Sequence, residues 1–317
     1  MNIYRSLIIL VSMSPTLLQA ANLFVNSENN GANCIATAPC ATIQEAINLA
    51  ESNDTIHVAA GTYFENIAIP NSKDGLTIRG ARHGKTNIVS AGGDVVPKQA
   101  PAGVPVDIIV DIFAPNVTIA NLTLIHPADE ASKRDMGVFI RPPAINATIR
   151  NCHVKRERVG AVLEPTAPGS RAIFAIRTSG TAVLHNTLSG NYQDHIHFPT
   201  SGSTIRNNKV LNATRIGITI IQENATTLSE DNLITANKIL NSGGDGIQIQ
   251  GDSNVVFANK VIGSGGYGIH LCGESSNPGC VPPGQNATAS QNIVKANRLK
   301  DNSLGNLADY GSDNIVK

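Results

Sequence analysis

RAIFAIRTSGTAVLHNTLSGNYQDHIHF (171–198), RIGITI (215–220), GDGIQIQ (244–250) and GYGIHLC (266–272) carry the pattern that decides the fold. Later extended segments each place Asn before a basic residue: IRNNKVL (205–211), ITANKIL (234–240), VFANKVI (256–262) and VKANRLK (294–300). The first inward apolar positions recur at spacings of 22, 22, 29 and 22 residues: Phe174, Ile196, Ile218, Ile247 and Ile269. A period of about 22 residues with short alternating strands and no heptads predicts an all-β, single-stranded parallel β-helix whose coils stack on one another.

Alternation along the strands predicts which side chains face the core, because successive strand residues point to opposite faces. The predicted inward column is Val138, Phe174, Ile196, Ile218, Ile247 and Ile269. The predicted outward column is Phe139, Ala175, His197, Thr219, Gln248 and His270, with His195 on the same face as His197. A slip of one residue would bury histidines and expose isoleucines.

Length and composition favour one solenoid domain over residues 22–317 of the 317-residue chain. The 24 basic and 24 acidic side chains balance, so no charge pattern predicts a nucleic-acid partner. Trp is absent and aromatic residues make up 4%, which argues against an aromatic stacking platform. We expect a monomer.

The first 21 residues have a short basic start, an apolar centre and a small-residue end, which is typical of a secretory signal peptide. A single N-terminal membrane span is the alternative, although the apolar run is short and no later segment is long enough to span a membrane. Two local disulfides, Cys34 with Cys40 and Cys272 with Cys280, would fit a secreted or periplasmic protein. Cys152 remains as a buried thiol.

The segment ATIQEAINLAES (41–52) has apolar residues at helical spacing, with Thr42 and Glu45 forming a capping-box pattern. This helix is expected to cap the N-terminal end of the solenoid. Insertions are predicted at 81–106, 126–135, 155–170 and 273–290. The Asn column at Asn208, Asn237, Asn259 and Asn297 is predicted to form a stabilising hydrogen-bond ladder in the turns.

TIQEAINLAESNDTIHVAAGTYFENIAI (42–69) resembles the opening of pectinesterases and of other right-handed β-helix proteins of the pectin-lyase-like group. RAIFAIRTSGTAVLHNTLSGNYQD (171–194) looks like the pectinesterase segment from Gln-Ala-Val-Ala-Leu to Tyr-Gln-Asp-Thr, without a gap. The resemblance implies that Gln193 is the oxyanion-binding glutamine and Asp194 the catalytic acid. However, Arg171 replaces the first family glutamine and Arg215 replaces the nucleophilic aspartate. Because a guanidinium is not a nucleophile, pectinesterase activity is disfavoured.

Arginine and histidine at these places suit a uronic-acid polymer, because Arg pairs with carboxylates and His exchanges a proton near neutral pH. The predicted catalytic residues are His197, His195, Asp194 and Arg215, and the predicted substrate-binding residues are Arg171, Gln193, Gln248 and His270. Related β-helix lyases and epimerases use Arg, Lys or His in this way. The sequence therefore favours a polysaccharide lyase or epimerase acting on an acidic polysaccharide.

A non-catalytic β-helix that binds glycan or serves as a surface component is the alternative, since outward His and Arg are often merely solvated. A metal site formed by His195, His197 and Asp194 is an alternative, but the two histidines share a face without a third matching ligand. No metal or other cofactor is therefore expected, and no pattern supports a Ca²⁺ site. Asp245 alone among the acidic residues has a suitable place for inverting hydrolysis, which needs paired carboxylates.

Overall fold

A computed structural model describes residues 19–29, 31, 33–82, 84–92, 106–128, 134–158, 169–222, 229–273, 280 and 289–317. Residues 1–18 of the expected signal peptide lie outside this set, as do large parts of the expected insertions. No helix among the described residues has the length and apolar character needed to cross a membrane.

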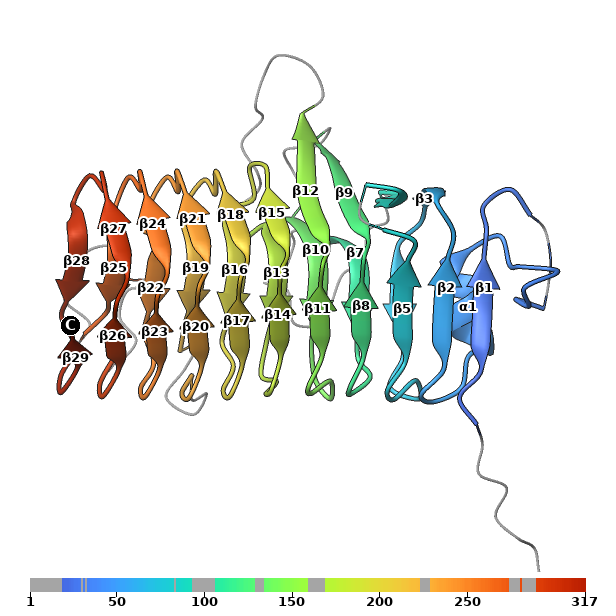
Figure 1. The fold of residues 1–317 in the computed structure, drawn as a ribbon, viewed down its shortest axis with the longest axis horizontal. Coiled ribbons are helices and arrows are strands. Elements are labelled where there is room, and N and C mark those ends of the chain that lie inside the picture. The colour runs from blue at the N-terminus through green and yellow to red at the C-terminus, as the bar shows by residue number, and fades with distance from the viewer. Residues whose placement is uncertain are drawn as a thin grey trace, which may run out of the picture.

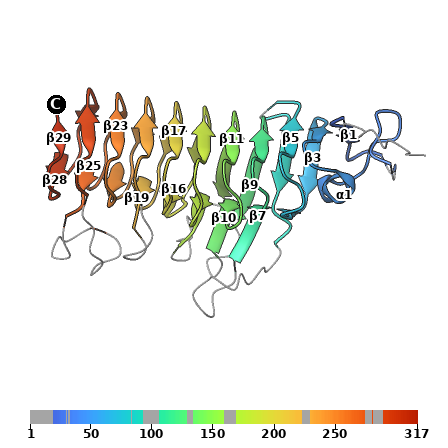
Figure 2. The ribbon, with the colours of Figure 1, turned by 90° about the horizontal axis from the view of Figure 1, so that it is seen from below.

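The chain winds into a solenoid with three parallel sheets, and each coil contributes one strand to each sheet in turn (Figures 1 and 2). Sheet 1 contains β1 (Asn22–Val25), β2 (Thr55–Val58), β5 (Thr77–Gly80), β8 (Thr118–Ala120), β11 (Thr148–Arg150), β14 (Ala182–Leu184), β17 (Thr204–Arg206), β20 (Leu233–Thr235), β23 (Val255–Phe257), β26 (Ile293–Lys295) and β29 (Ile315–Val316). Sheet 2 contains β3 (Gly61–Phe64), β6 (Thr86–Val89), β9 (Thr123–Ala128), β12 (His153–Arg158), β15 (Thr187–Ser189), β18 (Lys209–Leu211), β21 (Lys238–Leu240), β24 (Lys260–Ile262) and β27 (Arg298–Lys300). Sheet 3 contains β4 (Ile67–Ile69), β7 (Val106–Ile112), β10 (Arg134–Ile140), β13 (Arg171–Ala175), β16 (Asp194–Phe198), β19 (Ile216–Ile220), β22 (Ile247–Ile249), β25 (Tyr267–Leu271) and β28 (Gly305–Asp309).

One short helix, α1 (Ile43–Leu49), lies at the N-terminal end of the solenoid (Figure 2). Its capping box is formed as predicted: the Thr42 hydroxyl accepts from the Glu45 backbone N–H, and the Glu45 carboxylate accepts from the Thr42 N–H. Ile43, Ala46 and Ile47 are buried against the first coil. The predicted parallel β-helix with an N-terminal capping helix is therefore confirmed.

Two columns of largely buried asparagines run through the turns of the later coils. In the predicted ladder, the backbone N–H groups of Asn208, Asn237 and Asn259 each donate to the side-chain oxygen of the next Asn, at 2.8–2.9 Å. Cys152 begins this column, because its N–H donates to Asn186 Oδ1 at 2.9 Å. A second ladder, which the sequence analysis missed, contains Asn232, Asn254, Asn292 and Asn314. Both ladders hold neighbouring coils in register.

The predicted insertion boundaries were too wide, because strands continue into them. The strand β6 lies wholly inside the stretch 81–106. Likewise β9 extends to Ala128, β10 begins at Arg134 and β12 extends to Arg158. The strands β9 and β12 rise above the body of the solenoid in Figure 1. The charged residues of these stretches predict loops. In the structure, β9 and β12 pair there, from His126 with Arg156 to Ala128 with Arg158.

Candidate functional site

The predicted site lies on the outer face of sheet 3, where alternation breaks by one residue. Asp194 and His197 are three residues apart, yet their side chains meet: Asp194 Oδ2 lies 3.1 Å from His197 Nδ1. Asp245 and Gln248 repeat this spacing, with Gln248 Nε2 3.0 Å from Asp245 Oδ2. Two consecutive residues between them must therefore point away from this face.

This break makes the predicted direction of His195 wrong. His195 pairs across the sheet with the position of Gly217, where an added Cβ would lie 2.7 Å from the core side chain of Ile239. The His195 ring is fully buried and stands edge-on to the core residue Tyr192, with centroids 6.0 Å apart. Its Nε2 lies 3.1 Å from the Gly190 carbonyl oxygen. His195 and His197 thus point to opposite sides, and they do not form the alternative metal site with Asp194.

The predicted columns also need one correction at β13. Ile173, not Phe174, pairs with Ile196 and continues the inward column. Phe174 pairs with His197 and lies in the outward column, where the sequence analysis had placed Ala175. The predicted pairing from Ile196 to Ile269 and from His197 to His270 is confirmed. The outward column therefore contains Asp111, Phe139, Phe174, His197, Thr219, Gln248 and His270.

Asp194 is the centre of a buried ionic cluster that includes three of the predicted residues around it. Arg215 donates to both of its carboxylate oxygens, through Nε to Oδ1 at 2.8 Å and through Nη2 to Oδ2. His197 approaches the same carboxylate, and Arg171 Nε lies 3.9 Å from Oδ2. The structure thus brings Asp194, His197, Arg171 and Arg215 together.

Protonation in this cluster follows from burial and from the neighbouring charges. Burial alone would raise the pKa of Asp194, but the hydrogen bonds and charges of His197 and Arg215 lower it below its ordinary value. Burial lowers the pKa of His197 to about 4, and the positive charge of Arg171 acts in the same direction, while Asp194 opposes both. His197 is therefore neutral near pH 7. Its Nε2 has no hydrogen-bond partner among the residues that the structure describes.

Two phenylalanines border this cluster on the N-terminal side. Phe139 and Phe174 stack with ring centroids 4.9 Å apart, and the Arg171 guanidinium carbon lies 4.6 Å from the centre of the Phe174 ring. Arg171 Nη1 also donates to the Gly169 carbonyl at 2.7 Å. Gln193 turns toward the same segment, where its Oε1 accepts from the Gly169 N–H at 2.6 Å. The predicted residue Gln193 therefore lies at the border of the cluster and supports the 169–171 turn.

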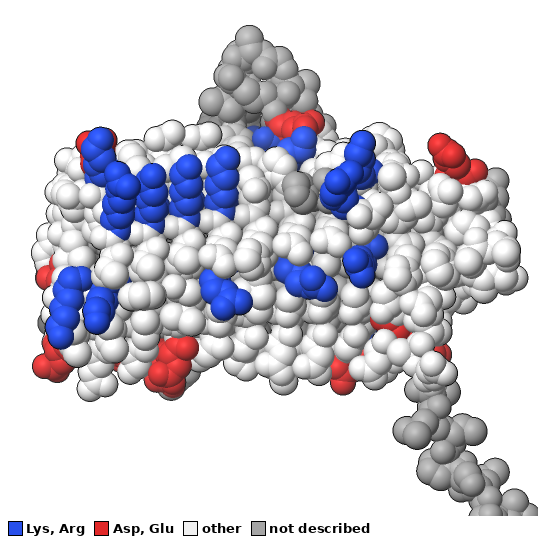
Figure 3. Space-filling model, in the orientation of Figure 1, with Lys and Arg blue, Asp and Glu red and all other residues white. Residues whose placement is uncertain are grey.

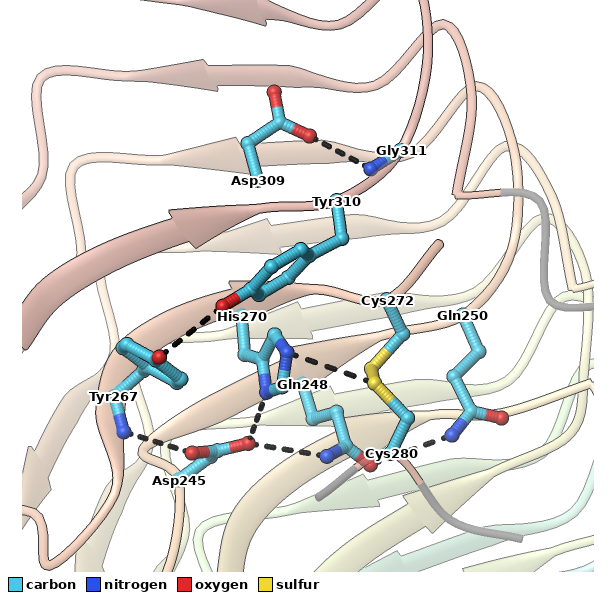
Figure 4. The surroundings of a disulfide bond; sticks show 10 residues. All are labelled: Asp245, Gln248, Gln250, Tyr267, His270, Cys272, Cys280, Asp309, Tyr310 and Gly311. Atoms are coloured by element: carbon cyan, nitrogen blue, oxygen red, sulfur yellow. Dashed lines mark hydrogen bonds and ion pairs between the residues drawn. A yellow bond between two sulfur atoms is a disulfide. The ribbon is translucent and has the colours of Figure 1, made fainter. Parts of the chain in front are cut away.

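The two remaining predicted residues, Gln248 and His270, belong to a second cluster centred on Asp245 (Figure 4). His270 Nδ1 lies 2.7 Å from Asp245 Oδ2, and the Tyr267 N–H donates to Asp245 Oδ1 at 2.8 Å. Both predicted disulfides are present, and Cys280 Sγ of one lies 3.5 Å from His270 Nε2. The second ring nitrogen of His270 therefore has a contact, whereas that of His197 has no hydrogen-bond partner among the described residues.

A third buried polar cluster was missed because four strands contribute to it and no local spacing reveals it. Asp107 and Asp135 are register partners in sheet 3, and His126 and Arg156 are register partners in sheet 2. Arg156 bonds to Asp135, and His126 Nδ1 lies 2.8 Å from the Tyr192 hydroxyl. Asp107, His126 and Asp135 have ligand atoms within 4.8 Å of one another. The guanidinium of Arg156 in their midst supplies a competing positive charge, so these residues fit an internal ion-pair network better than a metal ion.

Outside these clusters, Phe24, His57 and Arg79 help line a shallow depression of about 590 Å³ on sheet 1. Phe24 and His57 stack there with centroids 5.2 Å apart. None of the predicted site residues lines this depression. The depression is therefore separate from the predicted site.

Comparison with known proteins places the chain among β-helices. Among solved structures, pectate lyase Pel9A has 11% sequence identity and a TM-score of 0.58, and the match covers 92% of this chain and 78% of that chain. An alginate lyase from Paenibacillus sp. str. FPU-7 has 14% identity and a TM-score of 0.45, with 92% and 99% covered. The A-module of the Azotobacter vinelandii mannuronan C-5 epimerase AlgE4 has 13% identity and a TM-score of 0.46, with 87% and 94% covered.

No curated protein sequence matches the chain significantly. Residues 27–278 match the family described as "Right handed beta helix region", which is more than half of the chain. The three parallel sheets are consistent with a β-helix. The chain therefore belongs to the right-handed β-helix family.

Proposed function

We propose that this protein binds an acidic polysaccharide on the outer face of sheet 3 and acts on its uronic acid residues as a lyase or epimerase. The observation that carries this proposal is the state of His197. One ring nitrogen faces the Asp194 carboxylate at 3.1 Å, the other has no hydrogen-bond partner among the described residues, and burial lowers the pKa to about 4. The neutral imidazole carries the lone pair that a general base needs. A substrate carboxylate bound beside the ring would raise the pKa of His197 from this low value toward neutral pH, where a general base works best.

The charges around His197 fit one substrate carboxylate. Arg171 and Arg215 carry two positive charges and Asp194 carries one negative charge, which leaves one net positive charge beside a neutral His197. Both arginine side chains are partly open to solvent, at 15% and 27% exposure. Pairing the C5 carboxylate of a uronic acid with this excess charge would stabilise the enolate-like charge that develops when C5 loses its proton.

The reaction can then proceed in two ways. In both, His197 Nε2 takes the C5 proton, and the electron pair of the C–H bond moves toward the carboxylate. In a lyase, the C4–O bond then breaks, a C4–C5 double bond forms and the leaving oxygen takes up a proton from water. In an epimerase, C5 takes a proton from water on the opposite face. In both, the His197 imidazolium then returns its proton to the solvent. Asp194 positions the imidazole and stabilises the imidazolium that forms.

The same geometry disfavours pectinesterase chemistry. Arg215 holds Asp194 through two hydrogen bonds from the position where the pectinesterase resemblance would place the nucleophile. A guanidinium cannot attack an ester carbonyl, and the paired carboxylate of Asp194 has a lowered pKa that makes it a poor acid. Fold likeness does not decide among the remaining reactions, because one fold serves many chemistries. The two disulfides fit an exported protein that meets such polymers outside the cytoplasm.

A non-catalytic glycan-binding protein is the second candidate, and one observation favours it. His197 is only 3% exposed. Side chains around it would have to move before the C5 atom of a bound sugar could come within reach of His197 Nε2. A binding protein would need only the partly exposed arginines. The two candidates therefore differ in what His197 contributes.

Incubation of the purified protein with polygalacturonate and alginate in D₂O separates these functions. A lyase produces unsaturated ends that absorb in the ultraviolet, and an epimerase places deuterium at C5, visible as a lost proton resonance. His197→Ala should reduce turnover by roughly 10²–10⁴-fold while polymer affinity changes only a few-fold. The control His185→Asn replaces an exposed histidine at φ 57°, a backbone conformation that Asn tolerates, and should keep full turnover. Absence of both products on every uronan, with unchanged binding after Arg215→Ala, would contradict the proposal.

A further inference from the structure

Sheet 2 presents a straight column of basic side chains on its outer face. Lys209, Lys238, Lys260 and Arg298 are consecutive register partners in β18, β21, β24 and β27. We call these four residues the basic ladder. Figure 3 shows basic side chains standing side by side over these strands, with no acidic side chain between them. Three of the four are exposed and Lys260 is half-buried.

No described acidic side chain compensates the charge of the basic ladder. None of its four side chains takes part in an ion pair or hydrogen bond within the part of the chain that the structure describes. Lys300, two residues after Arg298 in β27, does have a partner, with Nζ 3.3 Å from Asp301 Oδ2. Like charges directly opposite one another on neighbouring strands repel and destabilise the sheet. The chain has 24 basic and 24 acidic residues, so an overall excess of basic residues does not explain the column.

The turn before each rung fixes its position. Asn208, Asn237, Asn259 and Asn297 directly precede the four basic residues and form the buried asparagine ladder. Each of the first three also donates from Nδ2 to a backbone carbonyl of the preceding coil at 2.8 Å. The backbone under the charges is therefore already ordered, and a ligand would need to immobilise only the side chains.

An apolar row runs beside the basic ladder. Leu211, Leu240 and Ile262 are also register partners, two residues beyond the rungs, and they are half-buried. Such a surface suits a ligand with regularly spaced negative charges and an apolar C–H face, as a pyranose ring has. The strands β18, β21, β24 and β27 contain no aromatic residue. Because bases of single-stranded nucleic acids stack on aromatic side chains, this surface favours a polysaccharide.

We propose that the basic ladder is a second binding surface, which holds a linear anionic polysaccharide lying along the solenoid axis. Neighbouring rungs are about 4.8 Å apart in the strand-pairing direction. A polymer with one carboxylate on each sugar can place a charge near successive rungs. The ladder lies on sheet 2 and His197 on sheet 3, so this surface shares the ligand class of the proposed function but not its residues.

The test compares two variants that each lose four positive charges. The ladder variant carries Lys209→Gln, Lys238→Gln, Lys260→Gln and Arg298→Gln. The control variant carries Arg79→Gln, Arg206→Gln, Lys295→Gln and Lys317→Gln, all at exposed positions of sheet 1 or its C-terminal end. Both are made in a His197→Ala background, so that turnover does not alter the polymer, and affinity is measured with sodium polygalacturonate and neutral dextran at increasing NaCl.

Polygalacturonate should bind the ladder variant at least 10-fold more weakly than the parent, and the control variant within about threefold. The salt dependence of affinity should be shallower for the ladder variant, because fewer counterions are exchanged. Thermal melts should show both variants folded, since the replaced side chains lie at the surface. If the ladder variant nevertheless fails to fold, Lys238→Gln alone should still weaken binding more than Arg206→Gln.

Equal affinity of the ladder and control variants overturns the proposal, as does equal binding of dextran and polygalacturonate. Tighter binding of single-stranded DNA than of polygalacturonate at the same salt would also overturn it and assign the ladder to nucleic acid. If binding depends on the ladder but the wild-type protein turns over no uronan, the proposed reaction at His197 is refuted and the ladder proposal stands. If the wild-type protein turns over a uronan but binding does not depend on the ladder, the ladder proposal is refuted and the proposed reaction stands.

Discussion

Replacing Asn237 by alanine should destabilise the protein by about 4 kcal/mol. The buried Asn237 side chain makes four hydrogen bonds: Oδ1 accepts from the N–H and Nδ2 of Asn208, and Nδ2 donates to the Ile205 carbonyl and to Asn259 Oδ1. Each net hydrogen bond contributes about 1 kcal/mol, and the Asn208 N–H would be left buried without its acceptor. Urea unfolding followed by circular dichroism measures the change, and Asn48→Ala at an exposed position of α1 is the control.

The same ladder predicts how two such changes combine. The bond from Asn208 Nδ2 to Asn237 Oδ1 is lost in either single variant. The double variant Asn208→Ala/Asn237→Ala should therefore be about 1 kcal/mol less destabilised than the sum of the two single changes. A loss below about 1 kcal/mol for Asn237→Ala, or strict additivity in the double variant, would refute the view that the ladder stabilises the stack through these bonds.

Three further predictions follow from burial and charge. Ile247→Asp should cost at least about 3 kcal/mol in urea unfolding, because it places a carboxylate in the buried column, whereas Ile293→Asp at a 38% exposed position should cost much less. Stability should fall as the pH drops from about 6.5 toward 4, because burial lowers the pKa of His195 and His197 to about 4 while the unfolded chain binds both protons near 6.5. The expected loss of about 2 kcal/mol per histidine at pH 5 appears as a lower urea midpoint, and a flat profile between pH 7 and 5 would show that these rings are not buried and neutral. Arg215→Ala should weaken polygalacturonate binding by about 2–4 kcal/mol in calorimetric titration, since a charge-assisted pair is lost, and undiminished affinity would remove Arg215 from the binding surface.

Much of the fold could be predicted because it depends on periodic features. The inward isoleucines recur once per coil, and the capping box of Thr42 and Glu45 lies within four residues. Period-two alternation failed at His195, because sheet 3 strands place two consecutive residues inward and no residue type marks that break. Period-two alternation also predicts an outward, solvent-exposed side chain for Gln248. In the structure Gln248 is fully buried beside Asp245, so Gln248→Asp should destabilise the protein by setting two carboxylates together.

The candidate site was only partly predictable, for a related reason. Arg171 and Asp194 were found through resemblance of the segment 171–194 to pectinesterases, and Arg215 through the family spacing that follows it. The register of three neighbouring strands brings the three residues together. The network of Asp107, His126, Asp135 and Arg156 has no such local signal. Its members come from four strands, and three of those strands extend into stretches whose charged residues resembled loops.

Because every strand pairs with its neighbours in register, each coil adds one rung to every outward column at once. A duplication of residues 233–254, which span one coil from β20 to the residue before β23, would lengthen the basic ladder by one lysine and leave the neighbours of His197 unchanged. The length of polymer that such a protein grips can thus vary in whole coils, independently of the chemistry performed on it. Each duplicated coil would lengthen the bound stretch of polymer by about one sugar.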